Sequence, residues 1–287
     1  MLSLIIRKIL QNLSFFFTND MSDVKKKDNK IYMEIKIILD KEFKTSKNLK
    51  LTHNNFNKQI FEILKKGKIY NFLRNSFIQK MFFVHNRFFI IKELNNLKLN
   101  KRWGFYKKLL PEDNVGNPVR YFLYPKSSGN KINHVYHLSI LEDYLKIDLS
   151  NIKYVFEFGG GYGCMARIFF QINKNIKYLI FDTKLVNLLQ FYYLKQNKIN
   201  ASFSDRNQFI LKNDLKNLKS ETKKKSLFIA NWSLSETPIN FRNKFLKYIQ
   251  NYQYILIAFQ EHFEPYHMNL KFSFDLLCLH NNYKNLS

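Results

Sequence analysis

A glycine-rich segment near the middle of the chain holds the residues with the clearest chemical potential. Residues 153–167 read KYVFEFGGGYGCMAR, where an acidic residue and glycines follow the register acidic-x-Gly-x-Gly-x-Gly, with one more glycine inside it: Glu157, Gly159, Gly160, Gly161 and Gly163. The apolar run before them predicts a buried strand, and residues 164–171 have the composition of a helix start. Glycine permits positive φ and close approach of a ligand to the backbone, and the free N–H groups of a helix start face that ligand. The segment therefore predicts a nucleotide-like ligand.

The acidic residue two positions before the first glycine discriminates among nucleotides. A carboxylate repels a pyrophosphate at a helix N-terminus, whereas it attracts the ammonium and sulfonium groups of S-adenosylmethionine. The dinucleotide fingerprint places its third glycine where this chain has Cys164, so NAD fits less well. A mononucleotide P-loop needs Gly-Lys-Ser/Thr at the helix start, which residues 164–166 do not supply. Glu157 thus favours S-adenosylmethionine as the cofactor.

The segments after the glycines alternate between strand and helix patterns. Further strands are predicted at 176–181, 201–203, 226–230 and 254–259, and helices at 165–172, 184–195 and 241–249. This alternation implies a parallel sheet with right-handed crossovers, with ligands beyond the carboxyl ends of its strands. Polar residues stand at those ends: Asp182, Asp205, Asn231 and Gln260. Asp182, about twenty residues past the glycines, is expected to accept both ribose hydroxyls, and Asp205 and Asn231 are further cofactor candidates.

Three groups of polar residues are candidates for a base that removes a proton from an attacking hydroxyl. His134 and His137 share one face of a helix predicted to begin near residue 131. Ser233, Ser235 and Glu236 follow the fourth predicted strand, and Glu261 and His262 follow the fifth. We place His137 and Glu236 ahead of His262, although a helical His is more often structural and an acid after a strand more often a cap. No full set of metal ligands is recognisable, so no metal is predicted.

Several segments together carry a family resemblance. They are NVGNPVRYFL (114–123), INHVYHLSILEDY (132–144), VFEFGGGYG (155–163), FD (181–182), NWSLSE (231–236) and YILIAFQ (254–260). Over residues 111–262 the chain resembles the sugar O-methyltransferases of bacterial surface-polysaccharide clusters. The resemblance implies an α/β fold with a Rossmann-like class I methyltransferase sheet and helices on both faces, S-adenosyl-L-methionine as cofactor, and a sugar hydroxyl on a small molecule or oligosaccharide as acceptor. The family's sheet ends with two more strands, for which the tail after residue 260 is short, so its C-terminal strands are expected to be incomplete.

The remainder of the chain predicts a mostly helical N-terminal region. Residues 1–50 are expected to form a helix and a charged linker with at most one strand at 31–38, residues 51–130 a helical lid or acceptor-docking region, and residues 131–287 the cofactor-binding domain. Residues 1–17 are too short and too polar for a membrane span and lack a signal-peptide cleavage site. Weak contact with a membrane surface through this segment is the alternative to packing on its own domain.

The amino-acid composition limits the kinds of binding partner that the chain is expected to have. The formal net charge is +25, but the excess is almost all Lys, scattered through a chain rich in Asn, Ile, Phe and Tyr, as AT-rich codon usage would produce. Arg, which suits bidentate base and phosphate contacts, is scarce, so a nucleic-acid partner is disfavoured. The chain has 2 Cys, too few for a disulfide framework or a Cys-based zinc site, which suits a reducing cytoplasm. Nothing in the sequence predicts an oligomeric state.

These patterns predict an S-adenosylmethionine-dependent O-methyltransferase that acts on a sugar hydroxyl in surface-polysaccharide or nucleotide-sugar biosynthesis. An RNA methyltransferase is one alternative. Adenine-type enzymes carry Asn/Asp-Pro-Pro-aromatic after the fourth strand, where this chain has Asn231-Trp232-Ser233-Leu234, and the Cys of cytosine C5 chemistry is absent there. Methylation of a ribose or base oxygen would remain. The other alternative is a methyltransferase fold that binds a nucleotide or partner without turnover, which the short C-terminus favours.

Overall fold

A computed structural model describes residue 9 and residues 22–44, 55–65, 69–82, 84, 89–214 and 223–259. The chain divides into two compact units. The first, which we call the helical unit, comprises residues 1–147, 161–172 and 188–200; the second, the sheet unit, comprises residues 148–160, 173–187 and 201–287. These two units are interleaved along the chain, and the predicted domain boundaries at residues 50 and 130 stay predictions.

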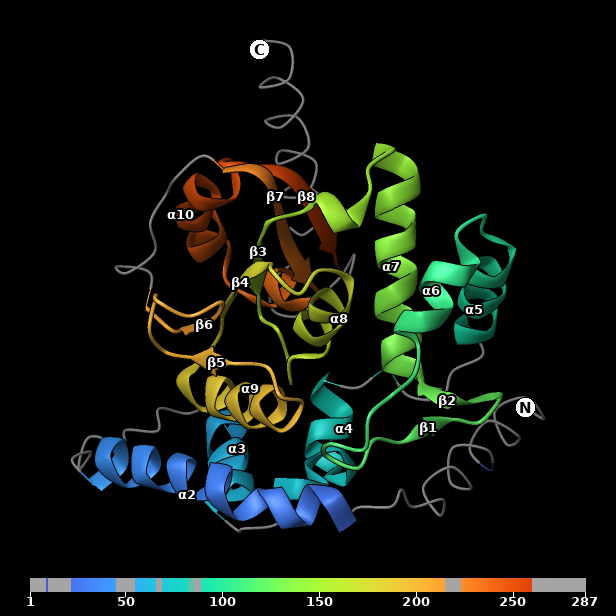
Figure 1. Ribbon diagram of the computed structural model, residues 1–287. Helices are drawn as coiled ribbons and strands as arrows, with labels where there is room; N and C mark the ends of the chain where they lie inside the picture. Colours follow the sequence, from blue (N-terminus) through green and yellow to red (C-terminus); the bar gives the residue numbers. More distant parts are fainter. Residues whose placement is uncertain are drawn as a thin grey trace. The chain divides into compact units, whose positions relative to one another are not determined.

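The sheet unit is built on a six-stranded parallel sheet (Figure 1). Its strands are β3 (Tyr154–Phe158), β4 (Lys177–Phe181), β5 (Ala201–Ser202), β6 (Phe209–Lys212), β7 (Lys223–Asn231) and β8 (Tyr252–Ala258). The order is β5-β6-β4-β3-β7-β8, and every neighbouring pair is parallel. The chain leaves β3 toward β4 on one side and returns to β7 on the other. The carboxyl ends of β3 and β7 therefore form the switch point at which ligands bind in such sheets, and the predicted parallel α/β fold is confirmed.

Apolar side chains dominate the strands because a parallel sheet buries both of its faces. One face carries a cluster of Phe156, Phe158, Phe181 and Phe228, against which α10 (Ile239–Ile249) packs (Figure 1). Phe245 of α10 is 0% exposed. Its ring centroid lies 4.9 Å from that of Phe158 and 5.7 Å from that of Phe156. This aromatic cluster therefore fixes α10 on the sheet.

The strand predicted at 201–203 is confirmed as β5 (Ala201–Ser202), but the sequence analysis missed β6. β5 lies at the edge of the sheet and pairs with β6, and β6 is the strand beside β4. Only three consecutive residues of β6, Phe209–Leu211, are apolar, and such a run is too short for a periodic signal. The segments predicted as the first, second, fourth and fifth strands correspond to β3, β4, β7 and β8.

The helical unit begins with a run of helices. They are α2 (Ser22–Lys44), α3 (Asn55–Lys65), the 3₁₀ helix η1 (Ile69–Arg74), α4 (Ser76–Phe82), α5 (Phe89–Leu99) and α6 (Trp103–Leu109). A short antiparallel pair, β1 (Arg120–Tyr121) and β2 (Tyr124–Ser128), leads into α7 (Gly129–Leu145), which lies beside α5 (Figure 1). The unit also contains α8 (Cys164–Ile172) and the second half of α9 (Lys184–Gln196). The mostly helical N-terminal region is confirmed.

The linker with a strand at 31–38 was wrong, because residues 22–44 form the helix α2. Ile35 and Leu39, four residues apart, are 0% and 5% exposed, so they bury one stripe of this helix. Tyr32 also donates a hydrogen bond of 3.0 Å to the carbonyl of Lys65 in α3. Packing of the apolar stripe therefore overrides the strand preference of the β-branched residues.

The terminal segments bear on two further expectations. No helix in the part of the chain that the structure describes is long and apolar enough to cross a bilayer. Apart from Ile9, residues 1–17 lie outside the described residues, as do residues 260–287, so the surface contact and the incomplete C-terminal strands stay predictions.

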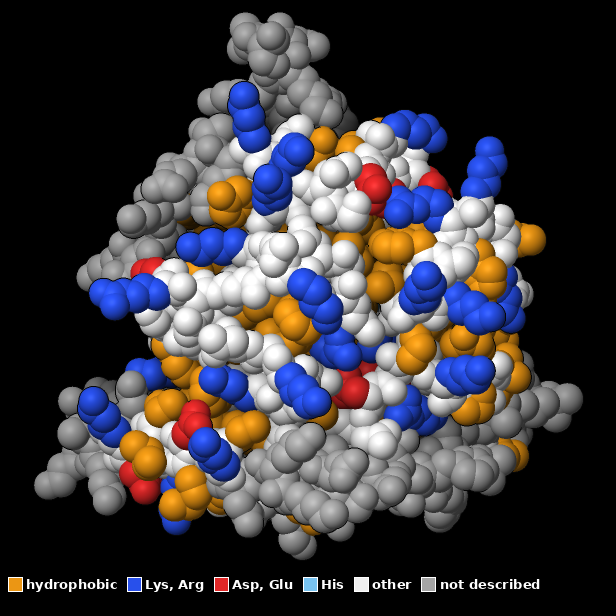
Figure 2. Space-filling model, in the orientation of Figure 1, with side chains coloured by type: hydrophobic (Ala, Val, Ile, Leu, Met, Phe, Trp, Pro, Cys, Tyr) orange, Lys and Arg blue, Asp and Glu red, His pale blue; other side chains and the backbone are white. Residues whose placement is uncertain are grey.

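Positively charged side chains are scattered over the face of the molecule drawn in Figure 2. On the face drawn in Figure 2, Lys and Arg side chains stand mostly singly among uncharged ones and do not merge into one basic stripe. A stripe or groove of clustered Lys and Arg is the usual footprint of a nucleic-acid partner. The net charge of +25 is therefore not gathered in that pattern on this face.

Phe245→Ala should lower the free energy of unfolding by about 3–5 kcal/mol, because it leaves a cavity at the centre of the aromatic cluster. Urea denaturation followed by circular dichroism measures this loss. Asn243→Ala, at an exposed position of the same helix, is the matched control and should change stability by less than about 0.5 kcal/mol. Equal losses for the two variants would show that α10 is not fixed by this cluster.

Candidate functional site

The glycine turn after β3 adopts a backbone that requires glycine. Three of its glycines have positive φ: Gly159 (70°), Gly161 (54°) and Gly163 (101°). A Cβ on Gly159 would overlap the side chain of Ser233, and a Cβ on Gly160 would lie 2.7 Å from Cγ2 of Ile180 and 2.9 Å from Oε2 of Glu157. The turn therefore brings bare backbone to the switch point of the sheet, as predicted for a turn that a ligand touches.

Glu157 lies in β3 directly beside this turn. Its side chain is 3% exposed, and Tyr178 of β4 donates a hydrogen bond of 2.9 Å to Oε2. The pKa of Glu157 is raised to about 8, mainly by burial. The nearby Asp182 contributes to this rise, and the hydrogen bond from Tyr178 opposes it. No Lys or Arg pairs with Glu157 within the described part of the chain. A cationic ligand at the turn would supply the missing counter-charge.

Asp182 follows β4 at the same edge of the sheet. Its Oδ1 accepts a hydrogen bond of 2.7 Å from the N–H of Thr183, and its own N–H donates to the carbonyl of Lys212 at 2.9 Å. The N–H of Gly159 donates to the carbonyl of Phe181 at 2.8 Å. These bonds connect the glycine turn to the end of β4, where Asp182 is partly exposed and able to meet a ligand.

Asp205 has a different setting from Asp182. It follows the edge strand β5, its carboxylate is 67% exposed, and it forms an ion pair of 2.9 Å with Nζ of Lys212. Asn213 and Asp214 follow β6, the neighbour of β4, and both are exposed. The prediction missed these two residues because it missed β6. Their signal was weak: the apolar residues 209–211 are followed by Lys212 before Asn213 and Asp214, whereas the run before Asp182 ends directly in the carboxylate.

The loop after β7 is attached to the neighbouring strands. It begins with Asn231 and continues into the 3₁₀ helix η4 (Ser233–Glu236). Oγ of Ser233 donates to the carbonyl of Phe158, and the N–H of Trp232 donates to the carbonyl of Ala258 at 2.7 Å. The loop is thereby fixed between the carboxyl ends of β3 and β8.

A buried arginine supports this loop from α10. Arg242 is 1% exposed and donates hydrogen bonds of 2.6 Å to the carbonyl of Ser235 and 2.8 Å to that of Thr237. Glu236 is exposed next to them, and partial desolvation raises the pKa of its carboxyl above the usual value. The loop therefore presents Glu236 from a rigid support.

His134 and His137 lie three residues apart in α7, as predicted. Burial lowers the pKa of His134 to about 3, with a contribution from His137, and lowers the pKa of His137 to about 4. Nδ1 of His137 is buried and has no hydrogen-bond partner among the described residues. Both imidazoles are neutral at pH 7. Of the two candidate bases, His137 belongs to the helical unit and Glu236 to the sheet unit.

Two further expectations concern metals and the C-terminus. Within the described ranges no group of three or more His, Cys, Asp or Glu side chains is placed to hold a metal ion. Gln260, Glu261 and His262 lie outside the described residues, so the candidacy of His262 stays a prediction.

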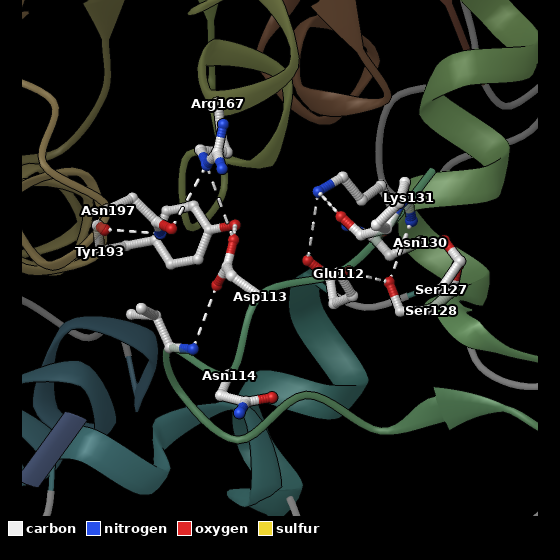
Figure 3. Close-up of polar contacts among 12 residues, drawn as sticks. Glu112, Asp113, Asn114, Ser127, Ser128, Asn130, Lys131, Arg167, Tyr193 and Asn197 are labelled. Atoms are coloured by element: carbon white, nitrogen blue, oxygen red, sulfur yellow. Dashed lines mark hydrogen bonds and ion pairs between the residues drawn. The ribbon is translucent and has the colours of Figure 1, made fainter. Parts of the chain in front are cut away.

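The helical unit contains a polar network that the sequence did not reveal (Figure 3). Glu112 forms an ion pair of 3.6 Å with Nζ of Lys131 and also accepts a hydrogen bond from Ser128. The side chains of Glu112 and Lys131 are 1% and 0% exposed. Lys131 also donates to the carbonyl of Pro111 at 2.8 Å. Burial raises the pKa of Glu112, and the Lys131 ammonium opposes the shift. This pair has its charges matched and therefore has a structural role.

The adjacent carboxylate connects the network to the glycine turn. Asp113 accepts a hydrogen bond of 3.2 Å from the hydroxyl of Tyr193 in α9 and lies 3.7 Å from Nε of Arg167 in α8 (Figure 3). Gln190 of α9 donates to the carbonyl of Gly161 at 3.0 Å. Asn130 of α7 donates to the hydroxyl of Tyr162 at 3.1 Å. Residues 161–163 are thus held by side chains of α7 and α9, and Asp113 fixes α9 and α8.

Comparisons with known proteins give the following. No protein-family model matches this chain, and no curated protein matches its sequence. Among solved structures, mitomycin 7-O-methyltransferase is 13% identical at a TM-score of 0.30, covering 45% of this chain and 37% of its own. Coclaurine N-methyltransferase bound to N-methylheliamine and SAH is 13% identical at a TM-score of 0.34, covering 86% of this chain and 60% of its own. This chain therefore spans less than two thirds of either protein, and likenesses at such TM-scores say nothing about its chemistry.

Glu157→Gln should make the protein less sensitive to alkaline pH. Because the folded pKa is raised from 4.5 to about 8, the neutral carboxyl stabilises the fold fully below about pH 4.5, and this stabilisation is lost as pH rises to about 8. Gln stays neutral throughout, so thermal unfolding should show similar stability at pH 5 and a variant more stable by about 5 °C at pH 9.

Glu34→Gln, at an exposed position of α2, is the control and should follow the wild-type curve. Parallel curves for Glu157→Gln and wild type between pH 5 and pH 9 would mean that Glu157 ionises as an ordinary carboxyl in the folded protein.

Proposed function

We propose that this chain is an S-adenosylmethionine-dependent methyltransferase whose acceptor is a sugar hydroxyl. The observation that carries the cofactor assignment is the setting of Glu157. It is a buried carboxyl without a cationic partner among the described residues, and it lies beside bare glycine backbone at the switch point of the sheet. Such a carboxyl favours a ligand with positive charge at that position. A pyrophosphate would bring further negative charge and no counter-charge for Glu157.

The residues present suit this cofactor group by group. Glu157 would face its ammonium and sulfonium charges, the backbone of residues 159–163 would lie against it, and Asp182 would accept the ribose hydroxyls. Asn231, at the end of β7, and Asp205 are the remaining candidates, and Asn213 and Asp214 lie nearer to Asp182 than the edge-strand Asp205 does in strand order. When bound, the cofactor supplies an electrophilic methyl group on sulfur.

The acceptor assignment rests on the family resemblance of residues 111–262 and on the polar loop after β7. Ser233, Ser235 and Glu236 provide hydroxyls and a carboxylate for hydrogen bonds to a polyol. The oxygen that attacks the methyl group loses its proton, so a base must lie within hydrogen-bond reach of it. The candidates for this base are His137, Glu236 and His262. The reaction we propose takes place on a nucleotide sugar or an oligosaccharide in the cytoplasm.

The chain should bind S-adenosylhomocysteine and not NAD, and Asp182→Asn should weaken that binding about ten- to a hundredfold. The loss corresponds to about 1.5–3 kcal/mol for one charge-assisted contact with two hydroxyls. Isothermal titration calorimetry with each ligand measures both effects. Asp148→Asn is the matched control, because Asp148 lies before β3, where it accepts a hydrogen bond of 2.9 Å from the N–H of Ser150.

Saturable binding of NAD with no response to S-adenosylhomocysteine would overturn the cofactor assignment. Unchanged affinity in a folded Asp182→Asn protein would remove only Asp182 from the site.

Replacing the base should lower turnover by roughly 10²- to 10⁴-fold and leave cofactor affinity almost unchanged, because a base acts mainly in the transition state. Methyl transfer to an identified acceptor is measured for His137→Ala and for Glu236→Gln. If His137 is the base, the acidic limb of the wild-type pH profile should lie near pH 4, where burial places its pKa, and the variant should lose it.

His134→Ala is the control and should affect packing or acceptor position more than turnover. Near-normal turnover in both His137→Ala and Glu236→Gln would make Glu261 or His262 the leading candidate.

A further inference from the structure

Trp232 has a backbone conformation that a tryptophan rarely adopts. Its φ is 68° and its ψ is −37°, in the positive-φ half of the map that favours glycine. For a bulky residue this is a strained conformation, and such strain persists where the surroundings enforce it, often at binding sites. A glycine at position 232 would relieve the strain, yet the chain has its largest side chain there.

The surroundings of Trp232 enforce this conformation. Its N–H donates to the carbonyl of Ala258 at 2.7 Å, and its carbonyl accepts a hydrogen bond from Oγ of Ser235. The next residue, Ser233, donates to the carbonyl of Phe158 and occupies the space beside Gly159. Arg242 holds Ser235 in turn, at 2.6 Å from its carbonyl. The backbone that carries the indole is therefore held by a rigid loop.

The indole is also exposed, which separates it from the aromatic core. It is 38% exposed, and it is the one large apolar side chain exposed to this degree among the described residues of the sheet unit. It stands at the carboxyl end of β7, one residue from the Ser233 that packs on the glycine turn. Glu236 and the hydroxyl of Ser233 lie in the same loop.

The strand order separates this loop from the ribose end of the cofactor. Asp182 ends β4, the glycine turn ends β3, and Trp232 follows β7 and bonds toward β8. A cofactor that reaches from Asp182 to the glycine turn, and at most to Asn231 at the end of β7, leaves the loop from Trp232 onward for the second substrate. An exposed aromatic ring in the same short loop as a carboxylate and a hydroxyl suits a ligand ring with an apolar C–H face and hydroxyls at its edge.

We propose that Trp232 is the platform for the acceptor ring, with a pyranose presenting its C–H face to the indole and its hydroxyls to Glu236 and Ser233. This inference rests on the proposed function and adds that the sugar is recognised as a ring and not only through its hydroxyls. Trp232 is then a binding residue that selects the acceptor, and Arg242 and Ser235 are positioning residues that act through it.

Fluorescence can isolate this side chain. The chain has two Trp, so Trp103→Phe leaves Trp232 as the sole tryptophan. This variant is titrated, in the presence of S-adenosylhomocysteine, with UDP-N-acetylglucosamine, UDP-galactose and GDP-mannose, and with UDP and GDP as controls for base stacking. A saturable change in emission with a nucleotide sugar, at least threefold larger than with its free nucleotide, is expected.

Substitutions separate a platform from a structural role. Trp232→Gly relieves the backbone strain but removes the ring, whereas Trp232→Phe keeps a ring. The platform predicts that Trp232→Gly raises the KM for the responding sugar at least tenfold, that Trp232→Phe raises it less, and that both bind S-adenosylhomocysteine within about twofold of wild type. Thermal unfolding confirms that each variant is folded.

Two results would overturn the inference while the cofactor assignment stands. One is unchanged Trp232 emission with every sugar of the panel, or a change that UDP or GDP reproduces alone, in a protein that binds S-adenosylhomocysteine. The other is a wild-type KM in Trp232→Gly, which would make the residue structural. Failure of the wild type to bind S-adenosylhomocysteine would instead overturn the proposed function, and this inference with it.

Discussion

The close approach of the loop after β7 to the backbone of Gly159 is the constraint on which the rest of the sheet unit depends. Ser233 occupies the space that a Cβ of Gly159 would need and donates its hydroxyl proton to the carbonyl of Phe158. The ladder between β3 and β7 sets the spacing of the two strands, and this contact continues it beyond the strand ends into the loop after β7. This contact also sets the path of residue 232, whose strained backbone follows from being held by β8 and by Ser235. The loop after β7 can therefore take this path at the switch point only because residue 159 is a glycine without a side chain.

Two buried carboxyls in this chain show how charge balance separates support from function. Glu112 is enclosed with the ammonium of Lys131 at 3.6 Å, so its charge is neutralised within the fold. Glu157 is also deeply buried, but its side-chain partner among the described residues is the hydroxyl of Tyr178. A hydroxyl stabilises a carboxylate far less than a cation does, which is why the pKa of Glu157 reaches about 8. A buried acid without a cationic partner among the described residues is a candidate for ligand binding, whereas a matched pair such as Glu112 and Lys131 has a structural role.

The sequence was informative where one local signal decided the structure, and uninformative where tertiary contacts decided it. Apolar runs ending at Glu157–Phe158 and at Phe181 located the central strands, since strands buried on both faces must be continuously apolar. The helix α2 was missed because only burial of Ile35 and Leu39 distinguishes it from a charged linker. The network of Glu112 and Asp113 had no signal at all. Its partners stand on other helices, and their spacing along the chain has no period.

The residues of the glycine turn are held by two separate sets of contacts. Residues 157–160 are fixed by the sheet unit, through the bond from Gly159 to Phe181 and the packing of Ser233. Residues 161–163 are fixed by the helical unit, through Gln190 and Asn130. Within the sheet unit, the position of the bare Gly159 backbone thus depends on the side chain of Ser233. Within the helical unit, Asp113 contacts Tyr193 of α9 and Arg167 of α8, and α9 supplies the Gln190 that bonds to Gly161. Loss of the Asp113 carboxylate is therefore expected to loosen residues 161–163 through α9, although Asp113 itself makes no described bond to them.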